Sequence, residues 1–178
     1  MIETMVVISI TLLMSGTLIA YNRSAERQLV LFRDQAILVG AINRTKSLSI
    51  ERFYNNPRVC AFGLYFSKVN QNFIIFQDLH PTSSEAVFVC RNDDGTFNSN
   101  LIYDFGEEIE RFSTDPRLSL ELKSGSNDLS SLTIVFIPPE ISVRADAPLP
   151  ATILLKDKNN FLRFSSVTIG QAGQIGVY

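Results

Sequence analysis

The chain is short of the residues that build metal and redox centres. Its 178 residues include no Trp, one His and two Cys, and these are too few ligands for a structural zinc site. The net charge is −2, so there is no global basic field to hold nucleic acid. A hydrophobic content of 46% excludes a wholly disordered chain. The length fits one domain, or one domain with an appended element.

Charge is almost absent from the beginning of the chain. Glu3 is the only charged residue among the first twenty, and no residue from Thr4 to Asn22 is charged. At about 1.5 Å per residue, residues 4–22 are roughly 28 Å long as a helix, close to the thickness of a bilayer's hydrocarbon core. We therefore predict that residues 1–22 form the transmembrane half of a long helix. A secretory signal peptide fits less well, because signal peptides begin with basic residues, whereas the only charged residue at the start of this chain is the acid Glu3.

The same helix is predicted to continue beyond the uncharged run. No Pro occurs before residue 57, so the backbone can stay helical to about residue 54. Over residues 23–54 the helix is amphipathic, and one stripe of its apolar residues can pack on a sheet. Two candidate stripes are present: Ala25, Leu29, Phe32, Ala36 and Val39 in the first, and Val30, Ile37, Ala41 and Leu48 in the second. Helices of this length are usually membrane spans, coiled coils or assembly elements. A simple membrane anchor with a stalk is the alternative to an assembly element.

Residues 55–178 predict a β-rich globular domain. Short apolar runs alternate with turn residues, and eleven of the chain's thirteen Phe lie here and favour a core made of sheets. The predicted strands are 59–66, 72–78, 86–90, 100–104, 117–122, 132–137, 151–156, 161–169 and 174–178. Because the connections are short, the pairing should be antiparallel. The expected fold class is α+β, with the long N-terminal helix packed on an antiparallel β-sheet-rich domain.

The two cysteines, Cys60 and Cys90, each lie in a strand-like run. Outside the cytoplasm such a pair readily forms a disulfide, which in the chain-entropy model adds about 3–4 kcal/mol to stability. Two buried free thiols, which pack as small hydrophobic side chains, are the alternative.

The remaining polar motifs do not indicate catalysis. His80 lies in a polar turn without a nucleophile elbow nearby. Residues 92–96 carry oxygen ligands but lack the alternating spacing of a calcium loop, so a turn is expected there. Glu107, Glu108 and Glu110 form an acidic cluster without a paired base, which predicts a solvated face. We expect no enzymatic activity, no cofactor and no metal site, and an envelope enzyme on a stalk is the weakest alternative.

The N-terminal order Met1-Ile2-Glu3-Thr4-Met5-Val6-Val7-Ile8-Ser9-Ile10 resembles the start of type IV pilins and type II secretion pseudopilins. In that family a phenylalanine-threonine-leucine-isoleucine-glutamate motif precedes an apolar run. Here Ile2-Glu3 and Val6-Val7-Ile8 match in register, with Met1 in place of the leucine. Residues 164–178 resemble the closing hairpin of minor pseudopilins. Prepilin peptidase and N-methylation are implied only if a leader peptide precedes Met1.

The resemblance implies a structural subunit, in particular a minor one, of a type IV pilus or type II secretion pseudopilus. The subunits would assemble through the apolar helix, and Glu3 would set the register by neutralising the N-terminal amine of an adjacent subunit. The expected transmembrane packing residues are Met5, Val6, Val7, Ile8, Ile10, Leu12, Leu13, Gly16, Leu18 and Ile19.

The resemblance also implies partners and a location. The expected partners are other pilin or pseudopilin subunits, an inner-membrane assembly platform and membrane lipid, with no nucleic acid. The subunit would be a single-pass inner-membrane protein before assembly and part of an extracytoplasmic filament afterwards. The alternative is a single-pass, membrane-anchored extracytoplasmic binding module with no filament role.

Overall fold

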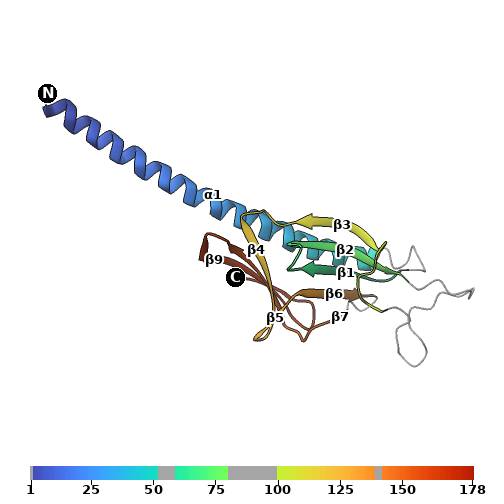
Figure 1. Ribbon diagram of the computed structural model, residues 1–178. Coiled ribbons are helices and arrows are strands. Elements are labelled where there is room, and N and C mark those ends of the chain that lie inside the picture. Colours follow the sequence, from blue (N-terminus) through green and yellow to red (C-terminus); the bar gives the residue numbers. More distant parts are fainter. Residues whose placement is uncertain (1, 52–58, 80–99, 139–141) are drawn as a thin grey trace, which may run out of the picture.

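A long helix and two antiparallel sheets make up the described part of the chain (Figure 1). The computed structural model describes residues 2–51, 59–79, 100–138 and 142–178, without the side chains of residues 19–24 and 161. Helix α1 covers Ile2–Glu51. Its first half projects away from the sheets as a rod, and its second half lies against them. The predicted α+β class is confirmed.

The strands form two five-stranded sheets, and every described strand pair is antiparallel. The first sheet has the order β3-β2-β1-β6-β7. Its strands are β1 (Val59–Ser67), β2 (Asn72–Leu79), β3 (Glu108–Ser113), β6 (Ser131–Ile137) and β7 (Ser142–Ala145). The second sheet has the order β10-β9-β8-β4-β5. Its strands are β4 (Leu118–Ser124), β5 (Asn127–Leu129), β8 (Ala151–Asp157), β9 (Asn160–Ile169) and β10 (Ile175–Val177).

The main core lies where α1 meets the two sheets. The helix contacts β1 and β6 of one sheet and β8 and β9 of the other. Strands β4 and β8 alternate buried and half-buried residues, as strands with a single buried face do. Strand β1 is buried along nearly its whole length because a second, smaller apolar cluster covers its other face. At Gly63 of β1, an added Cβ atom would lie 2.5 Å from the Phe76 ring, so only glycine fits this close approach.

The stripe of α1 that faces the sheets is not the first candidate stripe. The helix buries Val30, Leu31, Leu38, Ala41 and Ile42. Leu29, Phe32 and Ala36 of the first candidate stripe are exposed instead. A helix presents one arc to a sheet, and the neighbouring arc then remains in solvent. An apolar strip of α1 is therefore left uncovered beside the domain.

The observed strands differ from the predicted ones at four places. Residues 100–104 form a loop instead of a strand, in which the Asn100 Oδ1 atom accepts a hydrogen bond from the Ile102 backbone N–H at 2.9 Å. Strands β3, β5 and β7 were not predicted, because their outward-facing polar residues hide the apolar alternation. The predicted strand at 86–90 lies outside the described residues.

Within the part of the chain that the structure describes, no helix is both long enough and apolar enough to cross a membrane. The structure therefore does not show the membrane span that the sequence predicts over residues 4–22. The last residues of that predicted span, 19–22, have no described side chains.

Candidate assembly surface on the projecting helix

The first half of α1 exposes apolar side chains around its whole circumference. Every described side chain from Ile2 to Leu18 is exposed, and Leu13 keeps 70% of its surface in solvent. The exposed large apolar residues are Ile2, Met5, Val6, Val7, Ile8, Ile10, Leu12, Leu13, Met14 and Leu18. All the predicted packing residues except Ile19, whose side chain is not described, are thus on this surface. An apolar surface of this kind marks an interaction site.

The hydroxyl groups on this half do not make it polar. Ser9 donates to the Met5 carbonyl at 2.8 Å, and Ser15 donates to the Thr11 carbonyl at 2.7 Å. Thr11 and Thr17 donate to carbonyls three or four residues earlier in the same way. Because these four hydroxyls are already bonded within the helix, they can enter an apolar environment at little further cost.

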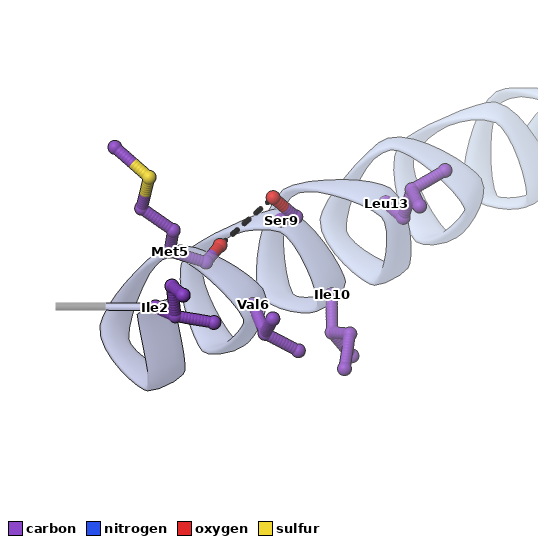
Figure 2. A pocket seen from close by; sticks show the side chains of 6 residues that line it. All are labelled: Ile2, Met5, Val6, Ser9, Ile10 and Leu13. Atoms are coloured by element: carbon purple, nitrogen blue, oxygen red, sulfur yellow. Dashed lines mark hydrogen bonds between the residues drawn. The ribbon is translucent and has the colours of Figure 1, made fainter.

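One face of this half is hollowed at Ser9. Figure 2 shows six side chains on that face, with the small Ser9 between larger apolar neighbours. The hollow measures about 290 Å³ and is lined by Ile2, Met5, Val6, Ser9, Ile10 and Leu13. Farther along, a Cβ atom added at Gly16 would meet nothing within 4 Å. Small residues at such positions allow a second helix to approach closely.

Glu3 lies in the first turn of α1, at the outer end of the apolar half. Its side chain is exposed, and it makes no ion pair with any described residue. The positive end of the helix macrodipole favours a carboxylate at this position in water. Once apolar surfaces cover this end, the same carboxylate needs a cation.

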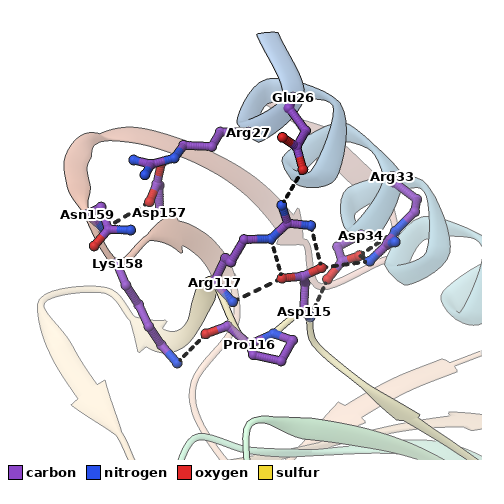
Figure 3. Close-up of polar contacts among 10 residues, drawn as sticks. All are labelled: Glu26, Arg27, Arg33, Asp34, Asp115, Pro116, Arg117, Asp157, Lys158 and Asn159. Atoms are coloured by element: carbon purple, nitrogen blue, oxygen red, sulfur yellow. Dashed lines mark hydrogen bonds and ion pairs between the residues drawn. The ribbon is translucent and has the colours of Figure 1, made fainter. Parts of the chain in front are cut away.

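A network of charged residues fastens α1 to the segment between β3 and β4, where the helix reaches the domain (Figure 3). Asp34 is only 5% exposed, and its Oδ2 atom accepts a hydrogen bond from the Asp115 backbone N–H at 2.7 Å. Arg33 donates to Asp34 Oδ1 and also pairs with Asp115. Arg117 joins Asp115 to Glu26 on the helix, at 3.0 and 2.8 Å. We call these five residues the helix clasp.

The helix clasp has a clear electrostatic signature. Hydrogen bonds from the Arg117 side chain and backbone hold the pKa of Asp115 at about 2, below its ordinary value of 3.8, and Arg33 adds to this effect. The same pairing, with help from Glu26, raises the pKa of Arg117. The sequence alone did not predict the helix clasp. Asp34 could have indicated it, because it lies on the same face of the helix as the apolar residues Val30 and Leu38. A carboxylate that is buried with such a face requires a polar partner.

The acidic cluster at Glu107, Glu108 and Glu110 is not the solvated, unpaired face that the sequence predicted. Glu107 is buried, and its carboxylate accepts hydrogen bonds from the backbone N–H groups of Leu79 and Asp104, both at 2.9 Å. Burial raises the pKa of the Glu107 carboxyl, while the two backbone donors oppose that shift. Basic partners from β3 and α1 pair with the other two acids: Arg111 with Glu108, and Arg44 with Glu110.

The structure describes only some of the other predicted sites. Cys60 lies buried in β1 and is disulfide-bonded. Cys90 lies outside the described residues, so its pairing with Cys60 stays a prediction. His80 and residues 92–96 also lie outside. Among the described residues, no group of three or more His, Cys, Asp or Glu is arranged to hold a metal ion.

Comparison with known proteins gives one structural likeness. No family model matches the chain, and no curated protein matches it. Among solved structures, the chain is similar to the minor pseudopilin EpsH from the Type 2 Secretion System of Vibrio cholerae. The TM-score is 0.49 and the sequence identity 11%, over 83% of this chain and 95% of that chain. The case for a function therefore rests on the residues of this chain.

Proposed function

We propose that this chain is a structural subunit, of the minor kind, of a type IV pilus or type II secretion pseudopilus. It would assemble by packing residues 2–18 of α1 against the same segment of other copies. The observation that carries the proposal is the ring of apolar side chains on that segment, which no other described part of the chain covers. Burying its ten large exposed apolar residues would contribute roughly 10–20 kcal/mol before the costs of association.

In this proposal Glu3 selects the axial offset between neighbouring copies. An unpaired carboxylate inside an apolar bundle costs several kcal/mol, whereas a well-placed cation offsets most of that cost. The offset that brings Glu3 to a cation is therefore favoured over others. The resemblance of the N-terminus to pilins suggests that this cation is the N-terminal amine of an adjacent subunit.

The helix clasp supports a mechanical role for the globular domain. It connects α1 to the segment between β3 and β4 near the place where the apolar half begins to project. A helix held at that point carries the domain at a set angle, so the packing of the helices would determine the spacing of the domains. No step of this function requires a catalytic group.

We further propose a location and partners for the subunit. Before assembly the apolar half of α1 would be held in the inner membrane, with the β-rich domain outside the cytoplasm. An assembly platform in that membrane would deliver the subunit to the filament. Cell fractionation of the tagged full chain should find it in the inner-membrane fraction, and recovery of the chain from the soluble cytoplasmic fraction would contradict this location.

The proposal predicts that a charge on the apolar half prevents assembly. The full chain is expected to form large oligomers when detergent is removed. Leu13→Asp would bury an unpaired carboxylate in the helix bundle, so it should abolish them. Analytical ultracentrifugation and negative-stain electron microscopy measure them. The matched control is Val69→Asp, because Val69 is also an exposed apolar residue but lies in the turn between β1 and β2.

Three outcomes decide the proposal. Loss of assembly in Leu13→Asp but not in Val69→Asp supports a filament subunit. Equal assembly of Leu13→Asp and the original chain contradicts it. An original chain that remains monomeric in lipid and after detergent removal also contradicts it, and favours the membrane-anchored binding module.

The register role of Glu3 is tested separately. Glu3→Ala should leave membrane association unchanged but slow or abolish assembly, because no charge then selects one offset. Asp128→Ala is the control, since Asp128 is an acid that lies exposed on the globular domain. Assembly of Glu3→Ala at the original rate would refute the register role without refuting assembly through the apolar half.

A further inference from the structure

A groove runs between the second half of α1 and the last two strands of the second sheet. Its volume is about 410 Å³. Helix residues form one wall, and β9 and β10 with the C-terminal residue form the other. The large apolar residues in it are Leu31, Phe32, Leu162, Phe164, Val177 and Tyr178.

Several of these apolar residues are strongly exposed, and the polar residues Gln28, Gln35, Arg163 and Ser165 complete the lining. Phe32 is 61% exposed, Leu162 89% and Tyr178 80%. The exposed apolar area of these three with Phe164 and Val177 is roughly 400–650 Å². One partner of a standard protein interface contributes about 800 Å², of which a little over half is apolar. The exposed surface of these five side chains, of which the groove itself is only a part, is therefore comparable with the apolar area on one side of a standard interface.

The groove faces the same side of α1 as part of the apolar surface of the projecting half. Val7, Met14 and Leu18 on the first half lie on the same side of α1 as Leu29 and Phe32 on the second half, because their spacings are close to whole helical turns. All five are exposed. The groove and part of the apolar surface of the projecting half therefore face the same side of α1, on either side of residues 19–24.

We propose that the groove is the lateral docking site for residues 2–18 of α1 from a second copy of this chain. The inference rests on the proposed function and names a surface of the globular domain that takes part in it. The segment 2–18 suits the groove because it is apolar and the hydroxyls of Ser9, Thr11, Ser15 and Thr17 are bonded within the helix. The occupant must come from another copy, because the continuous α1 keeps the middle of that segment about 30 Å from Phe32 of its own chain.

This docking fixes the axial offset between two copies. If the middle of segment 2–18 lies beside Phe32 of its neighbour, the two helices are offset by about 30 Å along their length. This neighbour is therefore a different copy from the one whose segment 2–18 packs alongside and whose N-terminal amine pairs with Glu3. The hydrophobic arc that the sheets leave uncovered on α1 is then covered by the partner helix. Each copy would insert its apolar half into the groove of one neighbour and receive the apolar half of another in its own groove. Because this contact joins two different surfaces, its repetition extends into a filament.

Photo-crosslinking from the groove tests the docking directly. A benzoylphenylalanine at position 32 of the full chain is mixed with isotope-labelled original chain, and the mixture is assembled by detergent removal and then irradiated. Trypsin cuts first after Arg23, so the proposed contact yields a crosslink to the labelled peptide of residues 1–23. The control places the same probe at Val69, which should give no crosslink to that peptide.

A substitution in the groove gives a second readout. Phe32→Glu should reduce the assembled fraction about tenfold, because a carboxylate would enter the apolar contact. The fold should be kept, since Phe32 is exposed in the single copy. Val69→Glu is the control and should assemble as the original chain does.

The outcomes separate the groove from the wider proposal. A crosslink to the labelled peptide 1–23, with weaker assembly of Phe32→Glu, supports the docking. Oligomers that form without this crosslink, or with Phe32→Glu assembling normally, overturn the docking but leave the filament function standing. Failure of the original chain to form oligomers overturns both.

Discussion

Removing the Asp34 carboxylate should weaken the attachment of α1 to the segment that connects β3 and β4. Asp34 Oδ2 accepts the Asp115 backbone N–H at 2.7 Å, and Oδ1 accepts the Arg33 Nη2 hydrogen at 2.8 Å. The two ends of the first bond are 81 residues apart in the sequence. The bond therefore exists only in the folded domain, and its loss should lower the free energy of unfolding.

The size of the effect follows from the burial of the two bonds. A hydrogen bond to a charged acceptor contributes about 1.5–3 kcal/mol, and leaving the backbone donor of Asp115 without its acceptor adds a desolvation cost. The Arg33 side chain is 57% exposed, so its ion pair adds at most about 1 kcal/mol. We expect Asp34→Ala to lower the free energy of unfolding by about 2–4 kcal/mol. Asp34→Asn keeps one oxygen for the Asp115 donor and should cost about half as much.

Urea unfolding of the full chain in detergent micelles measures this loss. Near-ultraviolet circular dichroism of tyrosine follows the domain itself, because Tyr65 and Tyr103 stack at 5.2 Å on the first sheet. The matched control is Asp128→Ala, whose carboxylate is 64% exposed and lies 4.0 Å from Lys123. This control should change the free energy by less than about 0.5 kcal/mol. If Asp34→Ala proved no more destabilising than the control, the reasoning about the helix clasp would be refuted.

Two further predictions concern acid stability and core packing. Because Arg117 holds the pKa of Asp115 at about 2, below the ordinary 3.8, the stability from this pair is complete above pH 4 and is lost as the pH falls through 2. Unfolding measured over this pH range should show a loss of about 1–2 kcal/mol of stability after allowance for solvent screening. In Arg117→Gln the stability should depend less on pH between 4 and 2. The same pH dependence in both chains would contradict the pairing. Gly63→Ala should destabilise the domain by about 1–3 kcal/mol or more, because the new methyl group meets the Phe76 ring and backbone of β6. Ser119→Ala, at a half-buried strand position, is its control, and equal unfolding midpoints for the two variants would show that the core accommodates the methyl.

The features that depend on local order could be predicted from the sequence. Absence of Pro and the run of apolar residues predict a helix from Ile2 onward, and the structure has it through Glu51. Alternating apolar residues predict β4 and β8 within one or two residues. The position of Glu3 at the outer end of the apolar half also follows from the sequence, because a helix converts residue number into distance along its axis.

The features that depend on contacts between distant segments required the tertiary structure. Either of two apolar faces of α1 could pack on the sheets. Helical spacing alone does not predict that Leu38 is buried while Phe32 stays exposed in the groove. Asp34 and Asp115 meet only because the folded chain brings the β3–β4 connection to the helix. Local pattern determines which side chains share a face, whereas the shape and charge of remote segments determine what that face touches.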